Sequence, residues 1–137
     1  MITTLPLTLY LAQAIALYLI LIGLSALARP DRWRAIMDEF AASPALALVT
    51  GVFTFILGAT LIYLHCILTD PLAIIVTAVG WIALLEGALL IVVPHLLVRV
   101  GHWSLRFTRV WAIVAIILGL FLGYAGLTGT AGHIQIV

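Results

Sequence analysis

The sequence predicts an all-α, polytopic membrane protein with four transmembrane helices, and three observations carry this prediction. Hydrophobic residues make up 66% of the 137-residue chain and charged residues only 8%. Because a water-exposed protein has roughly a quarter of its residues charged, most of this surface must face lipid. The mean hydropathy is +1.34, and all six basic residues are arginines in two short segments. Residues 1–137 are therefore expected to form a single membrane domain.

The long apolar stretches between these segments account for the four spans. A helix needs about 20 apolar residues to cross a bilayer, and backbone amides in lipid need partners within their own segment. Ser43-Pro44 and Thr69-Asp70-Pro71 are typical helix starts, with a cap residue before a proline. The second and third spans should form a tight antiparallel hairpin, because only residues 69–71 connect them. The predicted spans cover residues 5–28, 44–68, 71–93 and 110–127.

The arginines predict the orientation of these spans. They fall in the first and third connections only: Arg29, Arg32 and Arg34, then Arg99, Arg106 and Arg109. Arginine-rich loops stay on the cytoplasmic side of a membrane. Both termini and the turn at Asp70 are therefore expected outside.

The third connection also carries a polar stripe at helical spacing. Its members are separated by 4, 3, 4 and 3 residues: His95, Arg99, His102, Arg106 and Arg109. An apolar stripe runs beside it, so the pattern predicts an amphipathic helix in the inner membrane interface, broken at Gly101. The first connection shows a similar pattern. We expect this basic stripe to bind anionic lipid headgroups, and docking of an acidic partner protein is the alternative.

The two halves of the chain share several features. One set recurs at an offset of 64 residues and the other at an offset of 61: Gly23 and Pro30 match Gly87 and Pro94, and Gly58 and Tyr63 match Gly119 and Tyr124. One interpretation is two parallel helical-hairpin repeats, related by an axis along the membrane normal. The alternative is chance recurrence of glycine and proline.

Small residues recur along the spans at helical spacing. Lipid gives helices no hydrophobic reason to associate, so close packing at small residues decides which faces meet. The third and fourth spans carry the clearest ribbons: Gly80, Ala83 and Gly87, then Ala115, Gly119 and Gly123. Every span has such a seam, which is more than a loose monomer requires. The ribbon on the fourth span could serve the bundle or a partner protein equally well. The seams therefore predict a membrane protein partner or self-association.

Glu86 is the one acidic residue inside a predicted span. A charged group at mid-bilayer costs at least about 2.5–3.5 kcal/mol, so such residues are functional candidates. The preferred interpretation is a neutral Glu86 hydrogen-bonded to a neighbouring helix or partner subunit. The alternative is a proton- or cation-linked station. Trp81 lies deep in the same span, where its indole N–H needs a partner or a wet cleft.

Metal, cofactor and catalytic motifs are not predicted. His65 and Cys66 lie near Asp70 and His133 could approach them, but no ligand spacing supports a metal site, and His65 is expected to be interfacial. No cofactor is predicted, although ligation of a haem or chlorin by a single histidine against a neighbouring protein stays open. The chain has no nucleophile–base pair, phosphate loop or paired carboxylates. We therefore expect neither an enzyme nor a nucleic-acid-binding protein.

One stretch of the chain carries a family resemblance. Residues 18–40 contain Gly23 and the run Arg29-Pro30-Asp31-Arg32-Trp33-Arg34, and the helix start Ser43-Pro44 follows. In these features the first half to two-thirds of the chain resembles small, uncharacterised bacterial inner-membrane proteins. The resemblance implies a multi-pass protein of the bacterial inner (cytoplasmic) membrane and assigns no functional residue.

These observations favour a non-catalytic role. The preferred hypothesis is an accessory or assembly subunit of a larger membrane complex, or a homo-oligomer. The alternative is a small proton- or cation-linked transporter or channel that uses Glu86.

Overall fold

The computed structural model describes residues 4–66, 68 and 71–128, and within these ranges the chain is helical almost throughout. Four stretches are long enough and apolar enough to cross a membrane. The predicted fold class is therefore confirmed, and the chain is a multi-pass membrane protein. The spans are α1 (Thr4–Ala28), α3 (Pro44–Leu64), α4 (Pro71–Val92) and α6 (Thr108–Thr128).

These bounds differ from the predicted ones mainly at the end of the second span. That helix stops at Leu64, four residues early, because the backbone of His65 leaves the helical conformation (φ −145°, ψ 77°). The amphipathic connections form helices of their own, α2 (Pro30–Ala42) and α5 (Pro94–Ser104). The prediction of a break at Gly101 was wrong, because α5 continues to Ser104. A short 3₁₀ turn, η1 (Leu105–Phe107), joins α5 to α6.

Prolines set the corners of the chain. A proline occupies the first position of α2, α3, α4 and α5, where its fixed φ suits a helix start and its missing N–H is not needed. The residue before a proline is driven out of the helical conformation, which is observed at Arg29, Ser43 and Val93. Ser43 also caps α3, because its Oγ accepts a hydrogen bond of 3.3 Å from the amide of Leu46. Each span can thus end and turn sharply within one residue.

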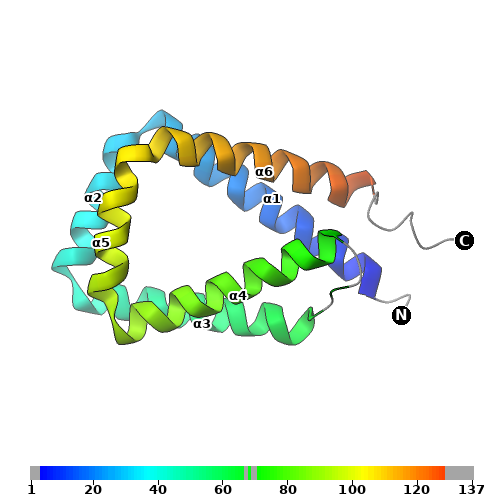
Figure 1. Cartoon of the computed structure of the whole chain (residues 1–137), viewed down its shortest axis with the longest axis horizontal. Helices are drawn as coiled ribbons and strands as arrows, with labels where there is room; N and C mark the ends of the chain where they lie inside the picture. The colour runs from blue at the N-terminus through cyan, green and yellow to red at the C-terminus, as the bar shows by residue number, and fades with distance from the viewer. Residues whose placement is uncertain (1–3, 67, 69–70, 129–137) are drawn as a thin grey trace, which may run out of the picture.

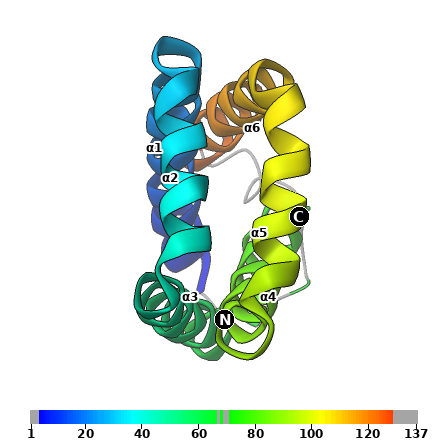
Figure 2. The same ribbon diagram turned by 90° about the vertical axis from the view of Figure 1, so that its left-hand side faces the viewer.

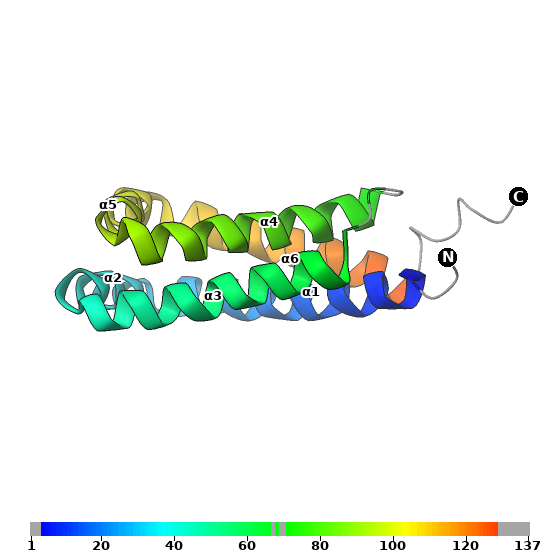
Figure 3. The ribbon, with the colours of Figure 1, turned by 90° about the horizontal axis from the view of Figure 1, so that it is seen from below.

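The six helices form two U-shaped halves. Helices α1–α2–α3 make one half and α4–α5–α6 the other, and the halves lie face to face as two layers (Figure 3). Helices α2 and α5 lie side by side across one end, here called the α2/α5 end (Figure 2). The opposite end, toward which both chain termini run, is called the terminal end (Figure 1).

The spans pair between the halves. Helix α1 packs along α6, and α3 packs along α4, so the predicted hairpin of the second and third spans is present. Within each half, the helix that connects the two spans holds them apart: α2 in the first half and α5 in the second. The two pairs meet at the terminal end and diverge toward the α2/α5 end (Figure 1).

Glycines allow the backbones of each pair to approach closely, and they do so in equivalent ways. A Cβ added at Gly23 would lie 2.9 Å from the carbonyl oxygen of Ala112, and one added at Gly87 would lie 2.8 Å from that of Gly51. Gly23 and Gly87 are 64 residues apart, and Gly51 and Ala112 are 61 residues apart. The two repeat offsets therefore relate one contact to the other. Gly58 against Leu84 and Gly119 against Ile20 form a second equivalent set. The two halves are therefore structural repeats related by a pseudo-two-fold axis.

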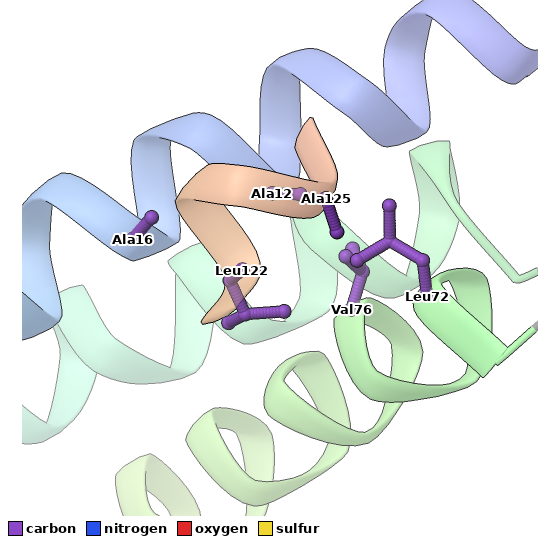
Figure 4. Packing of buried hydrophobic residues seen from close by; sticks show 6 residues of the cluster. All are labelled: Ala12, Ala16, Leu72, Val76, Leu122 and Ala125. Carbon is purple, nitrogen blue, oxygen red and sulfur yellow. The ribbon is translucent and has the colours of Figure 1, made fainter. Parts of the chain in front are cut away.

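A small core joins the two pairs at the terminal end. Its side chains come from α1, α4 and α6, and Figure 4 shows them converging: Ala12, Ala16, Leu72, Val76, Leu122 and Ala125. Ala12 and Val76, which are equivalent under the offset of 64, are both fully buried. The α1–α4 contact thus lies close to the pseudo-axis and closes the terminal end.

The predicted small-residue ribbons are used within the chain. Gly119 and Gly123 face Ala16 of α1, while Gly80 and Gly87 face α3. Ala83 lies against Gly58 of α3, and Ala115 borders a hollow between α1 and α6. The ribbons therefore pack within the chain, and a membrane protein partner or self-association stays a prediction.

Replacement of the pairing glycines tests this packing. In Gly87→Ala the new Cβ would meet the backbone of Phe55, so we expect the unfolding free energy in micelles to fall by about 1–3 kcal/mol. In the control Gly123→Ala the Cβ would lie 3.5 Å from Ala16 Cβ, an ordinary contact. That variant should be as stable as the parent or more stable, because alanine favours a helix. Equal stability of the two variants would contradict the proposed packing.

Candidate functional site: a cavity between the helix pairs

A cavity of about 450 Å³ lies where the two helix pairs diverge, next to α2 and α5. Five helices contribute to its wall, and most of the lining is apolar. The polar and aromatic lining residues are Tyr18, Trp33, Phe40, Thr50, Thr54 and Glu86.

Glu86 lies in the wall of this cavity. It stands six residues before the end of α4, which is about 9 Å along a helix that rises 1.5 Å per residue. Among the described residues, none donates a hydrogen bond to its carboxyl group and none forms an ion pair with it. The hydrogen bond to a neighbouring helix that we preferred from the sequence is thus not formed within the described chain. The carboxyl group is available to a bound molecule.

The neighbours of Glu86 give the cavity a definite chemistry. Tyr18, Trp33 and Phe40 supply aromatic rings, and Thr50 and Thr54 supply hydroxyls. Aromatic faces attract cations, and quaternary ammonium groups in particular. A carboxyl group beside aromatic rings in an apolar hollow therefore suits an organic cation better than a small hydrated ion.

Two tryptophans were not placed correctly by the sequence analysis: Trp81 was a candidate site residue, and Trp33 was not. Trp81 does not line the cavity: it is half-exposed on α4, at 49%. Trp33, which sequence reasoning did not single out, borders the cavity from α2, and its buried Nε1–H has no hydrogen-bond partner among the described residues. Its position between an arginine on each side in the sequence gave no signal of this burial.

The predicted basic stripe is divided between three elements. His95, Arg99 and His102 lie on α5, Arg106 lies in η1, and Arg109 lies in the first turn of α6. All five side chains are exposed. Because α6 turns away from α5 after η1 (Figure 2), only the first three residues share one helix.

His102 links α5 to α2. Its Nε2 lies 3.1 Å from Asp38 Oδ1, and its Nδ1 lies 2.9 Å from the carbonyl oxygen of Val98. A carboxylate and a carbonyl only accept hydrogen bonds, so both ring nitrogens must donate and the imidazole is a cation in this arrangement. The hydrogen bond to Asp38 raises the pKa of His102 above its ordinary value of 6.5, and the backbone hydrogen bond raises it further.

This ion pair lies on the pseudo-axis. Asp38 and His102 are equivalent under the offset of 64, and so are Met37 and Gly101, which touch where α2 crosses α5. A Cβ at Gly101 would lie 2.5 Å from Met37 Sδ, so glycine lets the helices cross closely. Sequence analysis did not connect these residues, although the repeat offset relates each pair.

His65 was expected at an interface but is fully buried. Its Nε2 lies 2.7 Å from Thr8 Oγ1, and its Nδ1 lies 3.2 Å from Thr77 Oγ1. Thr77 also donates a hydrogen bond to the His65 carbonyl. The equivalent position in the other pair has Gln13 donating to the carbonyl of Gly126. His65 therefore joins α1, α3 and α4 at the terminal end, a structural role.

The described residues contain no group of three histidine, cysteine or acidic side chains close enough to hold a metal ion. Cys66 is exposed. Asp70 and His133, considered above with His65, lie outside the described residues.

Comparison with known proteins places the first repeat in context. Residues 11–65 match the model of a family described as an uncharacterized protein conserved in bacteria (DUF2065). This stretch is similar to a bacterial family. No curated protein and no solved structure matches the chain. The matched residues run from α1 to the end of α3 and so coincide with one repeat, in agreement with the resemblance seen in the sequence.

The Asp38–His102 pair predicts a pH dependence. Because the pKa of His102 is raised in the folded protein, its stabilising contribution is complete below the unfolded-state pKa of about 6.5 and is lost as the pH rises through the folded-state pKa. Asp38→Asn should lower the pKa of His102 in an imidazole NMR titration. It should also make the melting temperature depend less on pH between the unfolded-state and folded-state pKa values of His102. Glu39→Gln, an exposed neighbour on α2, is the control. An unchanged pKa in Asp38→Asn would show that the pair does not form.

Proposed function

We propose that the protein is a small membrane transporter that binds an organic cation at Glu86. The observation that carries this proposal is the free carboxyl group in the wall of a cavity of about 450 Å³, beside aromatic rings and hydroxyls. A cation that enters the cavity would find an opposite charge, ring faces and apolar surface together. This function corresponds to the cation-linked alternative drawn from the sequence.

The repeat architecture supports transport in addition to binding. Transporters with parallel repeats move one repeat against the other around a site at the repeat interface. Here the cavity lies between the pairs and near the pseudo-axis, and it is lined by residues of both repeats. Among the described residues, the core around Ala12 and Val76 and the hydrogen bonds of His65 hold the terminal end, and a helix crossing with the Asp38–His102 ion pair holds the α2/α5 end. Movement of one repeat against the other would open one of these two ends at a time.

An accessory or assembly subunit is the second candidate, and one observation favours it. Arg34 and Arg106 line a hollow of about 270 Å³ beside the Asp38–His102 pair. Such a hollow on the α2/α5 end could receive an acidic segment of a partner protein. Anionic lipid headgroups would contact the remaining basic residues of α5 in either case.

The arginines support a location in the bacterial cytoplasmic membrane with the α2/α5 end inside. All six arginines of the chain lie at this end, in α2, α5, η1, the start of α6 or the residue before α2. The positive-inside bias then puts both termini on the outer side.

Binding of tetraethylammonium tests the role of Glu86. The protein in nanodiscs should bind the radiolabelled cation saturably, and proteoliposomes should take it up. Glu86→Gln keeps the side-chain volume but removes the charge, so affinity and uptake should fall by about tenfold or more, equivalent to about 1.4 kcal/mol. The matched control is Glu39→Gln, which lies outside the cavity and should behave as the parent. Equal binding by Glu86→Gln and the parent would refute the proposal.

Cys66 gives a direct test of orientation, because it is the chain's single cysteine and is exposed near the terminal end. In intact spheroplasts a membrane-impermeant maleimide should label it. In a Cys66→Ala background, Ala35→Cys on α2 should be labelled only after lysis. The reverse labelling pattern would place the α2/α5 end outside.

A further inference from the structure

The two repeats contribute two related hollows, and the second is the more apolar of the two, with the hydroxyls of Ser104 and Thr108 in its lining. The second hollow, of about 250 Å³, lies between α1 and α6. The repeat offsets relate part of its lining to that of the Glu86 cavity. Ile22 replaces Glu86, Trp111 replaces Thr50, and Ala115 replaces Thr54. Glu86, Thr50 and Thr54 of the first hollow thus each have a largely apolar side chain as their counterpart in the second.

Trp33 connects these two hollows. It lines the Glu86 cavity and also the hollow between α1 and α6. Helix α1, and α5 together with η1, also contribute to the lining of both hollows. On α1, Tyr18 borders the first and Ile22, one turn later, borders the second. On α5 and η1, Gly101 borders the first, and Ser104 and Leu105 border the second.

A polar cavity and an apolar hollow that share a wall match a molecule with two ends. We infer that the ligand is an amphipathic cation, whose charged head lies at Glu86 and whose hydrocarbon tail lies in the Ile22–Ala115 hollow beyond Trp33. The tail gains by leaving water for an apolar site. The head gains the charge and ring contacts of the first hollow. This inference rests on the proposed function and adds the chemical class of its ligand.

A series of probes with one head and increasing tail length tests the inference. Tetramethylammonium, butyltrimethylammonium and octyltrimethylammonium are titrated against the protein in nanodiscs, with partitioning into empty nanodiscs subtracted. The octyl compound should bind about tenfold or more tightly than tetramethylammonium, because each buried methylene favours binding. Glu86→Gln should weaken all three compounds by a similar factor.

Substitutions in the apolar hollow locate the tail. Ala115→Leu fills the hollow and should abolish the gain from the longer tail, while tetramethylammonium binds as before. Ala14→Leu introduces the same side chain at an exposed site of α1 outside both hollows and is the matched control. If Ala115→Leu loses tetramethylammonium binding through misfolding, Ile22→Thr decides the question. It places a hydroxyl in the hollow on a side chain one carbon shorter, so it does not block the space, and it should reduce the gain severalfold.

The outcomes separate the two proposals. Absent or Glu86-independent tetramethylammonium binding would overturn the proposed function. Glu86-dependent binding of tetramethylammonium without any gain from the octyl tail would overturn the amphipathic ligand alone. A gain that survives in both hollow variants would also overturn it, because the tail would then lie elsewhere.

Discussion

Close approach of helix backbones at glycine is the interaction on which this structure depends. In lipid the burial of apolar side chains gives no net drive for helices to associate, so contacts between backbones and small side chains must do so. Gly23 and Gly119 allow this approach in the α1–α6 pair, and Gly58 and Gly87 allow it in the α3–α4 pair. Between the two pairs, the described residues supply the terminal core, the hydrogen bond between His65 and Thr8, and the α2–α5 crossing. The cavity lies between these two ends, where the pairs diverge.

Local features of the structure could be read from the sequence, because local rules determine them. Proline and cap residues fixed where the helices start, and the apolar length fixed the spans. Glu86 was identified as a candidate because a carboxyl group is costly in lipid wherever its neighbours lie. The stripe spacing in the third connection predicted α5, but the helix continues past Gly101 to Ser104, and Gly101 instead lies against Met37 of α2.

Contacts between distant segments were not predictable from one sequence. His65 reaches Thr8, 57 residues away, and no local pattern indicates that pairing. The small-residue ribbons did not indicate which spans meet, because a sequence does not reveal that α1 pairs with α6. Trp33 and Tyr18 became site residues only when the fold brought α1 and α2 beside α4. The repeat pattern, however, contained information about the α2–α5 contacts. The offset of 64 residues relates Asp38 to His102 and Met37 to Gly101, and both pairs are in contact.

The pairing of spans between the halves has an evolutionary consequence. Residues 4–64 alone would form one U whose glycine faces have no partner, and a second copy of the same segment would satisfy both faces at once. The match of residues 11–65 to a bacterial family model covers this unit. A symmetric ancestor of two identical chains would have had two identical hollows. Fusion of two such copies into one chain would allow the hollows to diverge, as one position illustrates: Glu86 brings a carboxyl group to one hollow, and Ile22 brings a hydrocarbon side chain to the equivalent place in the other.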